Sequence, residues 1–132
     1  MHSYTMALFG EAEKGDFHVP YHCDTLPQLV EALGNPPPNT LGIYFAIQAL
    51  LFKRHLIFFR VKEEGFSIQD YFKGLHLLEK EEYTPNLEAI AIPGVGSTEI
   101  INGLQPLCAV RHTILLFTEM DFFDYIMEIS CA

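Results

Sequence analysis

Apolar residues along the chain fall into four short runs that predict β-strands. The runs cover residues 5–9, 55–61, 87–92 and 113–119. The run at 55–61, HLIFFRV, shows no alternation of apolar and polar positions, which is typical of a strand covered on both faces in a parallel sheet. The four runs therefore predict the centre of a mainly parallel sheet.

Segments with helical spacing lie between and after these runs, at about residues 25–33, 41–54, 67–78, 97–112 and 120–129. Thr25 and Gln28 have the spacing of a capping box, and Gly34 is a suitable stop for the first helix. Thr40 is expected to cap the second helix. Pro106 removes a backbone donor in mid-segment, which predicts a kink or two short helices there.

The order of these elements, β-α-α-β-α-β-α-β-α, predicts a single α/β domain over residues 1–132. We expect a three-layer α/β/α sandwich around a mainly parallel sheet of about four strands, with flavodoxin-like or Rossmann-like topology. Residues 11–24 are expected to form a long polar loop. An added antiparallel strand, and completion of the sheet by a second copy, both stay open.

Charge restricts the possible partners. Eight Lys and Arg residues stand against seventeen Asp and Glu, so the formal charge of −9 repels nucleic-acid phosphates and anionic lipid headgroups. The longest apolar run, residues 41–52, contains Gln48 and is shorter than the roughly 20 residues that a membrane span needs. We therefore expect no nucleic acid and no membrane as partners.

The cysteines indicate a reducing compartment. Cys23, Cys108 and Cys131 are few, widely spaced and without a CxxC pair, which argues against a disulfide framework or a zinc knuckle. The N-terminal residues show neither the basic nor the long apolar region of a signal peptide. These features predict a cytoplasmic protein without a bound metal or cofactor.

Ligands of such sheets bind outside the carboxyl ends of the strands, here the loops at about residues 10–24, 62–67, 93–98 and 118–121. In the third loop, Gly94 and Gly96 could let backbone amides approach an anion, with Ser97 and Thr98 adding hydroxyls and a helix N-terminus. The loop matches neither GxGxxG nor GxxxxGK[ST] and contains no lysine. The alternative is a simple strand-to-helix turn with Ser97 as the cap.

Acidic residues are the second candidate, because several follow the expected strands: Glu11, Glu13, Asp16, Glu63, Glu64, Glu119 and Asp121. Converging carboxylates could bind Mg²⁺ or supply an acid/base pair. Solvated loop charge is the alternative in a chain with seventeen acids. Among these acids, Glu11, Asp16, Glu63 and Glu119 are the ligand-site candidates.

The segment DFHVPYHCD contains side chains that bind transition metals. His18 and His22 are four residues apart, a zinc spacing that requires a helix, and Pro20 between them argues against one. Cys23 could act as a nucleophile only with a neighbouring base such as one of these histidines.

Arg60 stands out because it lies within a strand that should carry no charge. A buried guanidinium needs a carboxylate or an anionic ligand. We favour pairing with an acid such as Glu11 or Glu119, and an anionic ligand is the alternative.

Two functions follow from these observations. The helix at 41–52 and the aromatic tail carry more apolar surface than a four-stranded domain can bury, which predicts a binding module that forms a homo-oligomer or binds a protein partner. The tail residues concerned are Met120, Phe122, Phe123, Tyr125, Ile126 and Met127. The alternative is a small-molecule enzyme or a binder of nucleotides or small anionic ligands, which could use Mg²⁺ at the loops.

Overall fold

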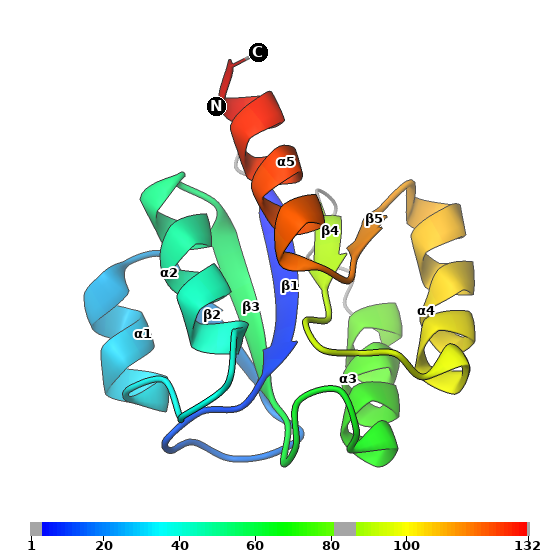
Figure 1. Cartoon of the computed structure of the whole chain (residues 1–132), viewed down its shortest axis with the longest axis horizontal. Coiled ribbons are helices and arrows are strands. Elements are labelled where there is room, and N and C mark those ends of the chain that lie inside the picture. The colour runs from blue at the N-terminus through cyan, green and yellow to red at the C-terminus, as the bar shows by residue number, and fades with distance from the viewer. Residues whose placement is uncertain (1–3, 81–86, 132) are drawn as a thin grey trace.

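A five-stranded sheet lies between two layers of helices in the computed structural model, which describes residues 4–80 and 87–131 (Figure 1). The strand order is β2-β3-β1-β4-β5. Four strands run parallel, and the edge strand β2 is antiparallel to β3. The strands are β1 (Thr5–Gly10), β2 (Pro20–Cys23), β3 (His55–Arg60), β4 (Leu87–Ala91) and β5 (Ile114–Leu116).

Helices cover both faces of this sheet (Figure 1). One apolar cluster joins the sheet to α1 (Leu26–Leu33), α2 (Gly42–Leu51) and α5 (Glu119–Cys131). A second cluster joins the other face to α3 (Ile68–Lys80) and α4 (Thr98–Arg111). The expected α/β sandwich with a mostly parallel sheet is thus confirmed. Within the described residues, no helix combines the length and apolarity needed to cross a membrane.

The sheet has five strands and not about four, because residues 20–23, predicted as loop, form the antiparallel edge strand β2, an addition that the sequence left open. Tyr21 pairs with Phe58 and Cys23 with Leu56, and only Cys23 of this strand is buried. Pro20 is tolerated because it is the first residue of an edge strand. Four residues that include a proline and an exposed histidine are too few to show a strand period.

Local signals fix several helix ends. Both hydrogen bonds of the Thr25–Gln28 capping box are present, and Gly34 ends α1 with a positive φ of 77°. Ser97 caps α4 as predicted. Of the two outcomes predicted around Pro106, a kink or two short helices, the second is wrong, since α4 is one continuous helix. Pro106 has no amide hydrogen to donate to the Asn102 carbonyl one turn earlier. Both residues are exposed, so water can solvate that carbonyl.

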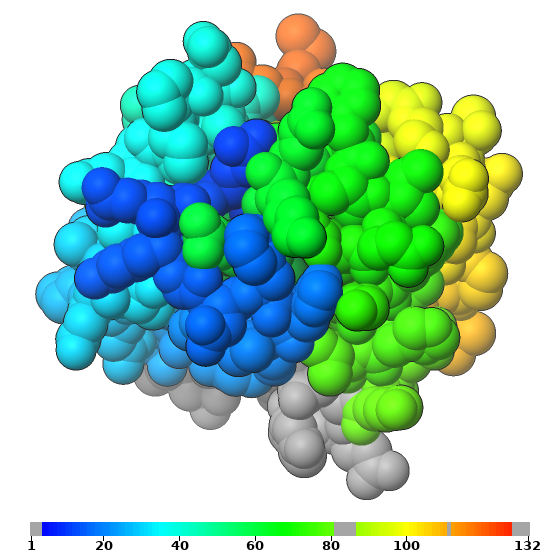
Figure 2. All heavy atoms as spheres, turned by 90° about the horizontal axis from the view of Figure 1, so that it is seen from below, coloured from blue at the N-terminus to red at the C-terminus, as the bar shows by residue number. Residues whose placement is uncertain are grey.

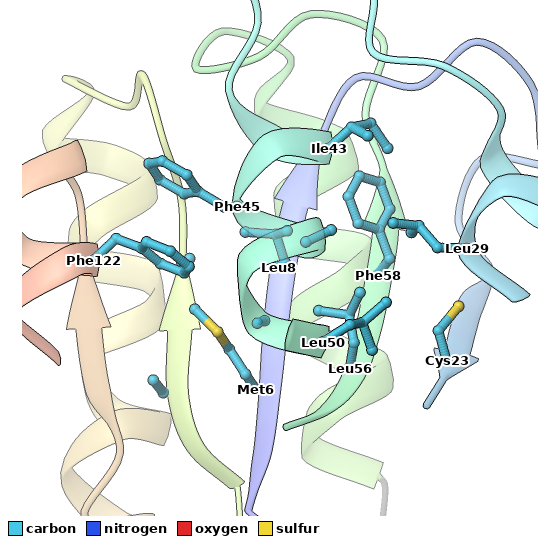
Figure 3. Close-up of a cluster of buried hydrophobic side chains, with 14 of the residues drawn as sticks. Met6, Leu8, Cys23, Leu29, Ile43, Phe45, Leu50, Leu56, Phe58 and Phe122 are labelled. Carbon is cyan, nitrogen blue, oxygen red and sulfur yellow. The ribbon is translucent and has the colours of Figure 1, made fainter. Parts of the chain in front are cut away.

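Aromatic stacking fastens α5 to α2. The Phe45 and Phe122 rings lie 4.3 Å apart between centroids at an interplanar angle of 6°. Both side chains are buried, and they face Met6 of β1 in the cluster shown in Figure 3. The C-terminal helix α5 is therefore joined to the core by Phe122.

Replacing Phe122 with Ala should lower the free energy of unfolding by about 3–5 kcal/mol, because the truncation leaves a cavity between α2 and the sheet. Urea denaturation measures the change. Phe66→Ala is the matched control: Phe66 is 69% exposed and lies outside α5, so its truncation should cost much less. Equal losses in the two variants would contradict this account of how α5 is held.

Candidate functional site

The loops at the carboxyl ends of the strands are packed backbone against backbone. A Cβ atom on Gly10, at the end of β1, would lie 2.7 Å from the Cα of Gly42 at the start of α2. A Cβ atom on Gly65, whose φ is +89°, would overlap the Gly94 carbonyl after β4. Figure 2 views the molecule from this end, where residues around 10–20 and 60–80 meet in the centre. Glycines therefore permit close packing here.

Glu64 fills the space at the N-terminus of α2. Its Oε1 accepts a hydrogen bond from the Leu41 amide at 2.8 Å, and its Oε2 accepts from the amides of Gly42 at 3.2 Å and Glu11 at 3.0 Å. The expected Thr40 cap is wrong, since the Thr40 hydroxyl donates to the Pro37 carbonyl and α2 has no cap from its own segment. A carboxylate from another loop satisfies these orphan amides instead.

Glu11 returns this interaction, because its Oε2 accepts a hydrogen bond from the Glu64 amide at 3.0 Å. Burial raises the pKa of Glu64, and the nearby Glu11 charge adds to the rise; the three backbone amides act in the opposite direction without cancelling it. Helix N-termini at strand ends commonly hold phosphate in α/β proteins. In this chain a carboxylate of the protein occupies that position.

Arg60 contacts the loop that follows β1. Its Nη1 donates to the Gly15 carbonyl at 2.5 Å, and its guanidinium carbon lies 4.4 Å from the centroid of the Phe17 ring. No carboxylate pairs with Arg60 in the described part of the chain, so the expected pairing with Glu11 or Glu119 is wrong. The turn at Gly15 places a backbone carbonyl and the Phe17 ring against the guanidinium, where an acid was expected.

His18 is oriented by a buried carboxylate. Its Nε2 lies 2.6 Å from Oδ1 of Asp70, whose side chain is only 5% exposed, and the backbone of His18 has a φ of 64°. The other oxygen, Oδ2, accepts from the Lys62 amide at 2.8 Å. Burial by itself would raise the pKa of Asp70, but hydrogen bonds from Lys62, His18 and Ser67 outweigh it and lower the pKa.

The loop after β4 has the architecture of a strand-to-helix turn. Gly94 has a φ of 81°, and the Ser97 hydroxyl accepts from the Ile100 amide at 3.5 Å. Thr98 is the first residue of α4, and a Cβ atom on Gly96 would meet nothing within 4 Å. The turn accounts for these residues, and anion binding at them stays a prediction.

The remaining candidate acids lie apart from one another. The Asp16 amide donates to the Tyr21 hydroxyl, and the exposed Glu63 donates through its own amide to Ser67 Oγ. Glu119 begins α5. Across residues 4–80 and 87–131, no group of three or more His, Cys, Asp or Glu side chains is arranged to hold a metal ion.

In the segment DFHVPYHCD, His22 and Asp24 both contact His55, whereas His18 and Cys23 have other surroundings. His22 Nδ1 lies 3.0 Å from His55 Nε2, and His55 Nδ1 lies 2.7 Å from Asp24 Oδ1, along the β2–β3 edge. Cys23 points into the core at 1% exposure, and burial, with the Asp24 charge, raises its thiol pKa. The burial of the Cys23 thiol and its raised pKa argue against the nucleophile hypothesis for this residue.

Two grooves lie beside these loops. One, of about 310 Å³, runs between α2 and α5 and is lined by Leu41, Tyr44, Phe45, Ile47, Gln48, Glu119 and Phe123. The other, of about 240 Å³, lies on α3 and is lined by His18, Lys73, His76, Leu77 and Lys80. Sequence reasoning missed the second groove, although the basic residues recur on one helical face at i, i+3 and i+7.

Comparison with protein-family models, with curated proteins and with solved structures found no match to this chain. Its function must therefore be argued from the geometry above.

Glu64→Gln should lower the free energy of unfolding by about 1–3 kcal/mol, because both carboxylate oxygens accept backbone hydrogen bonds and the amide group can replace only one of them. Glu11→Gln is the control, since the single bond that Glu11 accepts can be kept by the amide oxygen. Urea denaturation of both variants checks this. Equal stability of the Glu64→Gln and Glu11→Gln variants would show that the hydrogen bonds to the Glu64 carboxylate do not stabilise the fold.

Asp70→Asn should lower stability at neutral pH and make unfolding less sensitive to acid. The lowered pKa of Asp70 means that its carboxylate stabilises the fold above the unfolded value of about 3.9, and that this contribution is lost as pH falls through the folded pKa. The difference in unfolding free energy between wild type and variant should thus shrink below about pH 4. A difference that grows on acidification would contradict this role.

Proposed function

We propose that the protein is an interaction module that associates with a second copy of itself through the α2–α5 face. The observation that carries the proposal is a set of large apolar side chains around the α2–α5 groove that are between 40% and 72% exposed. These side chains are Tyr44, Leu51, Met120, Phe123 and Met127. Exposed apolar patches of this kind are typical of protein interfaces.

The exposed side of α2 is uncharged along its whole length. Tyr44, Ile47, Gln48 and Leu51 follow the i, i+3, i+4, i+7 spacing of one helical face, and none of them is buried. A surface helix normally turns charged residues toward water. The absence of charge on this face supports contact with another protein surface.

The exposed side of α5 has the same spacing. Met120, Phe123, Asp124 and Met127 form its stripe, in which Asp124 is the one charged member. The two stripes adjoin across the groove, whose walls come from both helices. Together they form a two-helix apolar face, which is half of the packing unit of a four-helix bundle.

A second copy can pack on this face because the exposed stripe of α5 lies beside the α2–α5 groove. In a twofold dimer, α5 of each copy can pack into the groove beside α2 of the other. This pairing places the acids of α5 against the uncharged wall of α2, with Glu119 as the one acid among the residues that line the groove, whereas α5 against α5 would bring several like charges together. Because the chain has a charge of −9, the uncharged face of α2 is a favourable surface for contact with a second copy.

The nucleotide-binding alternative has less support from the geometry. The parallel strands follow the order β3-β1-β4-β5, which is compatible with a flavodoxin-like doubly wound sheet, a topology that we propose for the chain. The amides at the N-terminus of α2 are nevertheless used by Glu64. Cys23 and Cys108 are buried free thiols, which agrees with our proposal of a cytoplasmic protein.

Light scattering coupled to size-exclusion chromatography tests the proposal. The wild-type chain should elute with the mass of a dimer, and Phe123→Glu should shift it to a monomer, because the new carboxylate would lie in an apolar interface. Tyr44→Glu should act in the same way from the other wall of the groove. A monomeric wild type at high protein concentration would overturn the proposal.

Phe66→Glu is the matched control. Phe66 is 69% exposed, lies in the loop before α3 and is absent from both grooves. The substitution makes the same chemical change away from the α2–α5 face, so it should leave the dimer intact. Dissociation by Phe66→Glu would indicate that added negative charge, and not the location, separates the copies.

A further inference from the structure

We infer that the groove on α3 is a binding site for the phosphate group of a small phosphomonoester. Four of its five lining residues carry cationic or ionisable nitrogen groups: His18, Lys73, His76 and Lys80. The chain has only eight Lys and Arg residues against seventeen acids. Two lysines and two histidines in one groove therefore contrast with its overall negative charge.

The position of these groups follows from helix geometry. Lys73, His76 and Lys80 lie on the same side of α3, one turn apart, and their side chains are exposed. Lysine ammonium groups on flexible stems bind phosphate as point charges. The half-buried Leu77 between them adds an apolar wall for the organic part of a ligand.

His18 reaches this groove from a different part of the chain. The loop after β1 crosses the end of β3, and the residue before His18 is held there by the Arg60 guanidinium. Asp70 binds His18 Nε2, so the ring is oriented before any ligand arrives. The left-handed backbone of His18 is an uncommon conformation for a residue with a side chain, and surrounding contacts must maintain it.

Among the described residues, the two acids beside the groove are already engaged by other groups. Asp70 is buried, and both of its oxygens are engaged, by His18 and by the Lys62 amide. Glu79 lies 3.7 Å from His76 through one oxygen and is the acid on α3 that a ligand would compete with. Within the described part of the chain, Lys73 and Lys80 form no ion pair, so their ammonium groups can meet an anion beside the oriented His18 ring.

The size of the groove selects the class of ligand. Pockets for drug-sized molecules measure about 300–1,000 Å³, and this groove, at about 240 Å³, is smaller. It suits a phosphate group with a small apolar substituent. The site lies on α3, on the opposite face of the sheet from α2 and α5, so it does not depend on the proposed dimer.

Titration of the ¹⁵N-labelled protein with phenyl phosphate, followed by NMR, tests the inference. Amide shifts should concentrate at residues 18 and 73–80, and sodium chloride at matched ionic strength should not reproduce them. Inorganic phosphate should shift the same amides at higher concentration, because it lacks the apolar contact with Leu77. Equal affinity for the two probes would overturn the assignment to a phosphomonoester.

Charge-matched variants separate a site from a general attraction. Lys73→Gln combined with Lys80→Gln should weaken phenyl phosphate binding by about tenfold or more, since charge-assisted hydrogen bonds to the phosphate are lost. Lys14→Gln combined with Lys53→Gln removes the same charge from exposed positions elsewhere and should leave the affinity unchanged. Equal weakening in both double variants would overturn the site.

A third variant tests the contribution of the crossing loop. His18→Asn removes the imidazole, and asparagine tolerates the left-handed backbone at this position. The variant should bind phenyl phosphate more weakly while keeping the NMR spectrum of a folded chain. Unchanged affinity in His18→Asn, or shifts that map to a different surface, would overturn the inference.

Discussion

The hydrogen bonds that Glu64 accepts from three backbone amides are the interaction on which the packing of the loops at the carboxyl ends of the strands depends. The amides belong to the loop after β1 and to the first turn of α2, while the carboxylate comes from the loop after β3. One side chain therefore joins the loops that follow β1 and β3 to the first turn of α2. The carboxylate also occupies the N-terminus of α2, a position at which other α/β proteins hold phosphate, so an anionic ligand would have to bind on another surface.

Much of the fold could be predicted from the sequence, because the signals that define it are local. The run at 55–61, which shows no alternation, predicted a strand covered on both faces, and all residues of β3 except its two ends are buried. Thr25, Gln28 and Ser97 act within their own segments, so their caps could be predicted from spacing alone. The strand β2 was missed because its stability comes from pairing with β3, a contact across more than thirty residues.

The candidate sites could be predicted far less well, since they depend on contacts between distant segments. Glu64 appeared in the sequence as one loop acid among several, and nothing local shows that its partners lie 22 to 53 residues away. Arg60 was correctly identified as unusual, but its contacts are a carbonyl and an aromatic ring, which no charge pattern reveals. The basic face of α3 was visible in the spacing, whereas the contribution of His18 required the path of the loop.

The close approach of Gly10 to Gly42 has a consequence for how this chain can diverge. A methyl group on either residue would meet the backbone of the other, and Glu64 Oε2 lies within 3.2 Å of where it would project. Substitutions at these three positions are therefore coupled, although the positions are far apart along the chain. In descendants or distant relatives, the two glycines and the glutamate should be retained or lost together, a pattern of covariation by which kinship could be recognised after overall identity has faded.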